Sequence, residues 1–350
     1  MCLSVRDSPG QTKGGLIHQS TCDALSEPGG FMQSLEMRGR GFSVLVVLIL
    51  AGGMEIPAVF AQSEQDSVIP VNQITQGGQP IVANLVRGGD SSRRIKNEAI
   101  AQLPVNSLTP AGQQQVQQVL KELSLFRRLP TLQIDADRRA YEYFADHPDV
   151  AVSIWRALQI SSVQMKEINP VQYQTDTRDG TVGTVDVLLR SPENYLVLCQ
   201  GQLQSPGMPR PIHAKALMHL QPRFGPQGKV THHLDLFVCF PSQTIETIAK
   251  LTSPVSFRIA DRNFEEVTLF LALMSNAMTR QPGWVEQTAG KLEGIFSQRP
   301  QELLKVTAAI YVDAERQRLT ALGQPVTIEN ILPATSSNVQ TAAEAEPAIR

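Results

Sequence analysis

The sequence predicts an α+β protein in which an antiparallel meander of about six to seven strands packs on one long helix, with additional C-terminal helices. The first observation is a change of period: between residues 161 and 240, apolar and polar side chains alternate with the period of two that strands have. The second is the segment 261–278, where apolar residues recur with helical spacing. A helix with so broad an apolar face has to be buried, and the preceding strands offer the surface. Its apolar residues are Phe264, Val267, Leu271, Met274 and Met278.

The chain before the meander is expected to supply a helix, a strand and a second helical segment. Pro110 stands in the first turn of an amphipathic helix expected over residues 109–130. Thr131–Asp135 is a short strand candidate, and it opens an α+β domain expected over residues 131–296. The helical segment that follows this strand is interrupted just before Pro148.

Short turns separate the expected strands of the meander. Asp179-Gly180 is a strong hairpin signal, and residues 191–194 are a turn by composition. The hairpin expected over residues 212–240 has one mixed polar face and one apolar face. We therefore expect a sheet that is covered on one side only. On its first strand the apolar face comprises Ala214, Ala216, Met218 and Leu220.

Further helices and a tail are expected after the meander. A short helix over 242–252 is followed by an extended segment over 254–259, which leads into the long helix. A further helix is expected over 284–296, and a C-terminal helix over 297–323. The tail 324–350 is rich in Ser, Thr, Ala and Glu, and we expect it to be disordered.

Residues 37–61 have the three parts of a secretory signal peptide: two arginines, an apolar core and a small-residue cleavage site. The alternative is a membrane anchor over 42–61, but glycines and a proline interrupt it before about 20 apolar residues accumulate. We therefore expect an exported protein, periplasmic or extracellular, that starts at Met37, with residues 1–36 as an extension upstream of the true start. Residues 62–108 are polar and lack a sustained period, so we expect a flexible linker.

The composition argues against several kinds of partner. The formal net charge is -2 and aromatic residues make up 5%, so neither a basic face nor base-stacking platforms for a nucleic acid are expected. Downstream of the signal peptide only Cys199 and Cys239 remain, both in expected strands. They could form one disulfide in an exported protein, but we favour two separately buried thiols.

The sequence has no catalytic motif above background, so we lean away from an enzyme and predict no cofactor. Asp176, Asp179 and Asp186 are expected to be solvated residues around a hairpin rather than an acid–base pair. The best metal-like set would require His219 to sit opposite His233. We favour a second interpretation, polar side chains on an open sheet face, because metal-ligand spacing of the His-x-x-x-His kind is missing. The set is His213, His219, His233 and Asp235.

In order, the expected elements are a strand, paired helices, an antiparallel meander and a long apolar-faced helix. This order resembles the helix-grip fold of the START-like, polyketide-cyclase-like superfamily over residues 131–278, with the helix 242–252 as a departure. The resemblance implies an apolar cavity between sheet and helix, used to bind lipids or other hydrophobic molecules. Met218 is a further adaptable apolar residue that could line it. The residues that would face the cavity from the helix are Val267, Leu271, Met274 and Met278.

We therefore predict an exported, non-enzymatic protein that binds a lipid or another hydrophobic small molecule between sheet and helix. The alternative is a cell-envelope interaction or scaffold protein with a filled core and no ligand. In that case the helices over 284–322 would contact an envelope protein partner.

Overall fold

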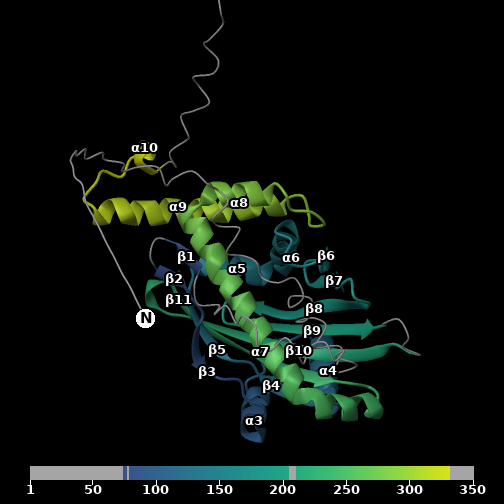
Figure 1. Ribbon diagram of the computed structural model, residues 1–350. Coiled ribbons are helices and arrows are strands. Elements are labelled where there is room, and N and C mark those ends of the chain that lie inside the picture. The colour runs from purple at the N-terminus through teal and green to yellow at the C-terminus, as the bar shows by residue number, and fades with distance from the viewer. Residues whose placement is uncertain (1–73, 77–78, 205–209, 332–350) are drawn as a thin grey trace, which may run out of the picture. The chain divides into compact units, whose positions relative to one another are not determined.

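The computed structural model describes residues 74–76, 79–204 and 210–331. The expected extension 1–36 and signal peptide 37–61 lie outside the described residues, as does the part of the expected tail beyond residue 331. Within the described residues the protein is α+β, with an antiparallel sheet and several helices (Figure 1). At this level the predicted fold class is confirmed.

The main sheet has nine strands, in the order β3-β5-β11-β10-β9-β8-β7-β6, with β4 also paired to β11. Strands β6 to β11 are consecutive neighbours and form a meander. The sheet is wider than expected because the chain before β5 adds β3 and β4. A separate pair is formed by β1 (Ile74–Gln76) and β2 (Gln79–Ile81). The main strands are β3 (Asn84–Arg87), β4 (Leu125–Arg128), β5 (Thr131–Asp135), β6 (Gln164–Asn169), β7 (Gln172–Asp176), β8 (Thr181–Ser191), β9 (Asn194–Leu203), β10 (Ile212–Phe224) and β11 (Lys229–Cys239).

Part of the range 62–108, expected to be a flexible linker, is a packed helix, α3 (Arg93–Ala101). The Ser92 hydroxyl caps it by accepting a hydrogen bond from the Ile95 N–H at 3.4 Å. Ile95 and Ala99 are fully buried against the sheet. The sequence signal for this helix is weak because only these two side chains, one turn apart, are buried.

The helix expected over 109–130 is shorter than predicted. α4 (Pro110–Lys121) begins as expected, but the chain then forms β4 instead of a further helical turn. Pairing with β11 prevails over helical spacing because Phe126 packs on Phe237, with ring centroids 5.1 Å apart. After β5, the predicted two-part helical segment is formed by α5 (Arg138–Asp146) and α6 (Pro148–Ala157).

The long helix α7 (Gln243–Arg280) is continuous, so the separate helix expected over 242–252 is wrong. Pro254 lies inside α7 and cannot donate the backbone hydrogen bond that the Lys250 carbonyl would accept. The Ser253 hydroxyl donates to this carbonyl instead, at 2.9 Å. The helix therefore passes through the proline without leaving the carbonyl unpaired.

The C-terminal helices differ in length from the expected ones. The helix expected over 284–296 ends at Ala289, whereas the one expected over 297–323 is close to its predicted bounds. The beginning of the range 324–350, expected to be disordered, contains a short helix. These three elements are α8 (Pro282–Ala289), α9 (Arg299–Ala321) and α10 (Ile328–Ile331).

Helices cover both faces of the sheet, whereas the alternation predicted cover on one side only. One face, called the α4 face here, packs on α3 and α4 through residues that include Leu198, Leu217, Phe237 and Cys239. The other, called the α7 face, carries α5, α6 and α7, and its buried residues include Cys199, Ala216, Leu236 and Val238. Cys199 and Cys239 are free thiols on opposite faces. The interpretation of two separately buried thiols is therefore confirmed.

A buried chain of hydrogen bonds joins α5, β11 and α7. The Tyr141 hydroxyl lies 2.6 Å from His232 Nδ1, and His232 Nε2 lies 3.0 Å from Thr268 Oγ1. Thr268 donates its own proton to the Phe264 carbonyl at 2.7 Å, so its oxygen accepts from His232 Nε2–H. His232 Nδ1 then accepts from Tyr141. The imidazole is held neutral, and burial lowers the pKa of His232 to about 3.

We expect the free energy of unfolding to fall as the pH drops from about 6.5 toward about 4, in part through His232. In the unfolded chain this imidazole, with a pKa of 6.5, takes up a proton in that range, whereas the folded one does not. Because the folded pKa is depressed, the stabilisation is complete above the unfolded pKa and is lost toward the folded pKa. His232→Gln should reduce the slope of the unfolding free energy against pH, measured by urea unfolding, by up to about 1.4 kcal/mol per pH unit. His213→Gln, on the surface, is the control, and equal slopes for both variants would refute the assignment.

Candidate functional site

Half-buried apolar side chains cross the centre of the sheet on its α7 face. The strand register pairs Val187 with Val197, Val197 with Met218, and Met218 with Leu236. Leu236 is buried, but the other three are only half-buried. Apolar side chains in the middle of a sheet that carries helices are normally covered completely. We call Val187, Val197 and Met218 the apolar strip.

The helices of the α7 face pass on either side of the apolar strip. α7 contacts β4 and β5, whereas α6 contacts β6 at the other side of the sheet. Strands β8 and β9 lie between the strands that α7 contacts and β6, which α6 contacts. Figure 1 shows α7 crossing the sheet in front of β10. Two partly buried side chains pack toward this region, Trp155 from α6 and Ile245 from α7. The strip is therefore flanked by helices but not closed by them.

The rows beside the apolar strip differ from each other. On one side lies a fully buried row, in which Ala249 of α7 packs over Ala216 and its neighbours. On the other side, Arg190 pairs with Tyr195, and Tyr195 pairs with Leu220. The apolar strip therefore lies between the buried row that contains Ala216 and the row that contains the Arg190 guanidinium and the Tyr195 phenol.

The structure separates the residues that the sequence assigned to one ligand site. Met218 lies on the apolar strip, whereas Met274 and Met278 are buried where α7 packs against α5, α6, α8 and α9. Leu271 is half-buried and packs against the same helical cluster, and Val267 is half-buried further along α7. Ligand contact by the four α7 residues stays a prediction. Among the five residues that the sequence assigned to the ligand site, Met218 lies on the apolar strip.

A polar cluster lies at the junction of α5 and α6, next to the row of Arg190. Arg190 Nε is 3.3 Å from Asp146 Oδ1, and Arg190 Nη2 donates to the Tyr173 hydroxyl at 3.4 Å. Tyr173 in turn donates to the Asp146 backbone carbonyl at 3.3 Å. Burial raises the pKa of the Asp146 carboxyl, and Arg190 lowers it by a smaller amount.

Deeper in the same junction, Arg299 ties the start of α9 to the sheet. It donates to Glu167 of β6 at 2.7 Å and to Glu302 at 2.6 Å. Asp149 is fully buried nearby, and burial raises the pKa of its carboxyl, with the charge of Glu167 adding to the effect. Burial lowers the pKa of His147 to about 4. This group supports the helical layer, and burial biases Asp149 toward its neutral form.

The weak metal-like set is not brought together. His219 pairs with Asp235 across the hairpin, and His233 pairs with Gln221, so the expected placement of His219 opposite His233 is wrong. His219 is buried with Nε2 3.1 Å from Asn194 Oδ1, and His213 lies at the exposed end of β10. Among the described residues, no group of three or more His, Cys, Asp or Glu side chains could hold a metal ion.

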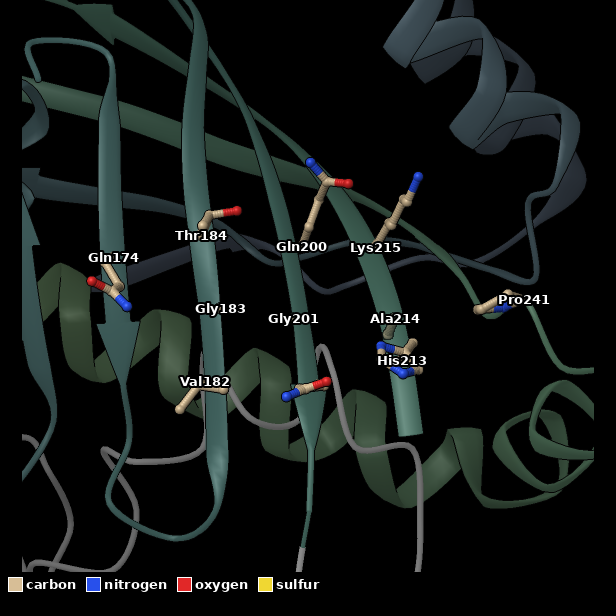
Figure 2. A pocket seen from close by; sticks show the side chains of 11 residues that line it. Gln174, Val182, Gly183, Thr184, Gln200, Gly201, His213, Ala214, Lys215 and Pro241 are labelled. Atoms are coloured by element: carbon tan, nitrogen blue, oxygen red, sulfur yellow. The ribbon is translucent and has the colours of Figure 1, made fainter. Parts of the chain in front are cut away.

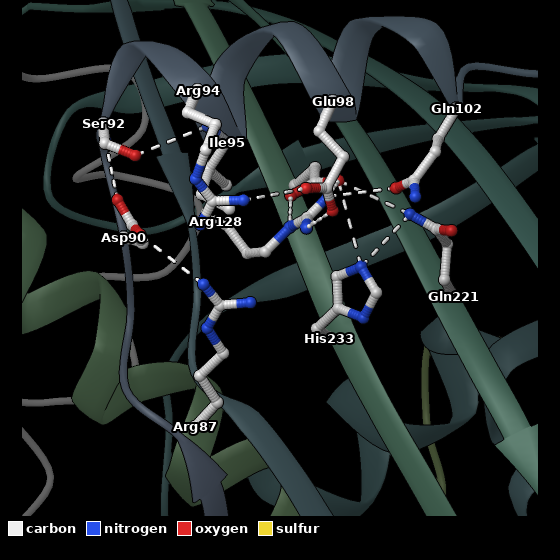
Figure 3. Close-up of polar contacts among 11 residues, drawn as sticks. Arg87, Asp90, Ser92, Arg94, Ile95, Glu98, Gln102, Arg128, Gln221 and His233 are labelled. Carbon is white, nitrogen blue, oxygen red and sulfur yellow. Dashed lines mark hydrogen bonds and ion pairs between the residues drawn. The ribbon is translucent and has the colours of Figure 1, made fainter.

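Asp235 belongs instead to a buried ion pair with Arg128 that the sequence did not reveal. Figure 3 shows Arg128 beside Glu98, Gln102 and His233. Arg128 Nε and Nη2 donate to the two Asp235 carboxylate oxygens at 2.7 and 2.8 Å. Arg128 also donates to Glu98 at 2.6 Å and to Gln102 at 3.1 Å, which ties α3 to the sheet. The hydrogen bonds that Arg128 donates to Asp235 hold the pKa of Arg128 above its ordinary value. Arg128 was missed because it was expected at the end of a helix, not on a strand.

A shallow depression of about 410 Å³ lies on the opposite side of the sheet, on the α4 face (Figure 2). A row of polar side chains crosses four strands there, because the register aligns Gln174, Thr184, Gln200 and Lys215. Gly183 forms part of its floor, and a Cβ there would come within 2.6 Å of the Gln200 carbonyl oxygen. Ligand pockets enclose most of the ligand surface, whereas this depression is open to solvent, so it is the weaker candidate.

No protein-family model matches this chain, and a search of curated proteins finds no match either. In the part of the chain that the structure describes, no helix is both long and apolar enough to cross a membrane. Function is therefore inferred from the geometry of the apolar strip and of the groups around it.

Proposed function

We propose that the protein binds a hydrophobic small molecule on the apolar strip, between α6 and α7. The observation that carries this proposal is the half-burial of Val187, Val197 and Met218 at the centre of a nine-stranded sheet. Water in contact with these side chains is unfavourable, and a ligand that covers them would gain roughly 1 kcal/mol for each. The neighbouring Trp155 and Ile245 would provide the walls.

The order of elements supports the same proposal. One strand, β5, is followed by the helices α5 and α6, the meander β6 to β11, and the long helix α7. This is the order of the helix-grip fold, whose members hold ligands between sheet and helix. Contacts of Ala260 and Phe264 with Leu132 and Leu234 support a helix that packs along one side of the sheet. In our proposal the ligand lies beside α7, over the sheet, and not under Met274 and Met278.

Val197→Lys should weaken the binding of a neutral hydrophobic probe such as N-phenyl-1-naphthylamine by at least about tenfold. The lysine places a charge at the middle of the apolar strip, and the charge has to be desolvated when the ligand binds. The measurement is a fluorescence titration of the purified protein. Val182→Lys is the matched control, because Val182 lies on β8 and is 40% exposed, on the opposite face.

Two results would contradict the proposal. Equal affinity in the Val197 and Val182 variants would place the probe elsewhere. No saturable binding to the unmodified protein would favour the alternative, a scaffold protein with a filled core.

A further inference from the structure

We infer that the ligand of the apolar strip is a single-chain amphiphile with a carboxylate head group, and that Arg190 binds this carboxylate. The inference rests on the proposed function, because it assigns the polar end of the same ligand. Two observations support it. Arg190 lies one row beyond the apolar strip, and its guanidinium has N–H donors that make no hydrogen bond within the described residues.

A bulge in β8 places Arg190 on the α7 face. The register with β9 shifts between Val187 and Leu189, so the alternation of side chains changes there. Leu188 and Leu189 both pack toward the α4 face, and Arg190 returns to the α7 face. It pairs with Tyr195, which stands two residues before Val197 on the same face. The distance between successive rows is about 7 Å, well within the reach of one extended molecule.

The guanidinium of Arg190 has donors left for a ligand. Its Nε lies 3.3 Å from Asp146 Oδ1 in an ion pair, but neither of these two atoms makes a hydrogen bond within the described residues. Among the described residues the guanidinium donates one hydrogen bond, from Nη2 to the Tyr173 hydroxyl, at 3.4 Å. Arg128 offers a contrast, because its guanidinium makes four hydrogen bonds of 2.6–3.1 Å. A guanidinium carries five N–H donors, so Arg190 can donate two hydrogen bonds to one ligand carboxylate.

The surroundings of Arg190 favour a carboxylate over a larger anion. The present partner, Asp146, is itself a carboxylate, so a ligand carboxylate would replace a group of the same shape and charge. The Arg190 and Asp146 side chains are 29% and 36% exposed, whereas their facing atoms Nε and Oδ1 are buried, so a ligand would reach the guanidinium through its Nη donors. Glu142 and Glu167 also lie in this region, and a doubly charged phosphate would face more repulsion than a carboxylate. The apolar chain of the ligand would extend from Arg190 over Val197 and Met218.

The test compares oleate with oleyl alcohol, which has the same hydrocarbon chain and an uncharged head. Isothermal titration of the full protein, below the concentration at which oleate forms micelles, should show oleate binding at least about tenfold more tightly. Arg190→Gln should remove this preference and leave the affinity for oleyl alcohol within about twofold. Arg190→Lys should keep part of it, because the charge stays and the bidentate geometry is lost. Arg223→Gln is the matched control, since Arg223 is an exposed arginine paired with Glu193.

The outcomes separate the inference from the proposed function. If neither molecule binds, the proposed function fails and the inference with it. If both bind with equal affinity, or if Arg190→Gln keeps the preference, the inference is overturned while the apolar site stands. The comparison on the unmodified protein needs no variant, so poor folding of Arg190→Gln does not block the test.

Discussion

Replacing Arg128 with methionine should lower the free energy of unfolding by about 3–5 kcal/mol, because it leaves a buried charge without its partner. The Arg128 side chain is 6% exposed and the Asp235 side chain 0%. Without the guanidinium, Asp235 keeps only a long contact to Gln221, at 3.4 Å, and the nearby His233. The loss should also loosen α3, which Arg128 holds through Glu98 and Gln102.

Urea unfolding followed by circular dichroism measures this effect. Arg223→Met is the control, because its ion pair with Glu193 is 3.0 Å long but lies on the surface, and its loss should cost less than about 1 kcal/mol. The double variant Arg128→Met, Asp235→Leu should recover part of the stability, because no unpaired charge is left. A single variant as stable as the control would show that the pair does not hold the sheet and α3 together.

Met274→Ala should lower the free energy of unfolding by about 2–5 kcal/mol, which is the range for emptying a packed methionine site. Met274 is 2% exposed among apolar residues of α5, α6, α8 and α9. Met218→Ala should cost only roughly 1 kcal/mol, because Met218 on the apolar strip is only partly buried.

The comparison of these two methionines distinguishes a packed interior from a binding surface. If both substitutions cost the same, large amount, the strip is a filled core and the alternative of a scaffold protein gains. If Met274→Ala lowers the free energy of unfolding by the smaller amount, the space under α7 that the sequence predicted would be the ligand site.

Where the sequence follows one strict period, it predicted the structure well. The alternation over residues 212–240 places Ala216 and Met218 on one face and His219 on the other, and β10 and β11 pair accordingly. The failures come from segments in which a local signal competes with a long-range contact. The helical spacing of apolar residues continues from α4 into the sequence of β4. Phe126 nevertheless packs on Phe237 in a strand pair, and this contact joins residues more than a hundred positions apart.

Other failures have local chemical causes. Pro254 indicated a break in α7, but the Ser253 hydroxyl supplies the missing donor. α3 buries two side chains only, too few for a periodic signal. Prediction of these elements would require knowledge of which backbone groups have partners in the folded chain.

The candidate site could be predicted only in part. Met218 was assigned as an adaptable apolar residue, and alternation placed it on the apolar face of its strand. Its partial exposure depends on where α6 and α7 pass over the sheet, which no local pattern encodes. Arg190 was missed because strict alternation from Val185 places Leu189 on the α7 face. The bulge after Val187 reverses this, since one extra residue moves every later side chain to the other face.

Methyl NMR of methionine-labelled protein tests the central claim most directly, because methionines mark both the apolar strip and the interior behind α7. During a titration with oleyl alcohol, the methyl signal of Met218 should shift progressively to saturation. The signals of Met274 and Met278, buried among the helices, should stay in place. Shifts of Met274 and Met278 with an unchanged Met218 would contradict the proposed site, and unchanged signals of all three at saturating ligand would contradict binding between sheet and helix.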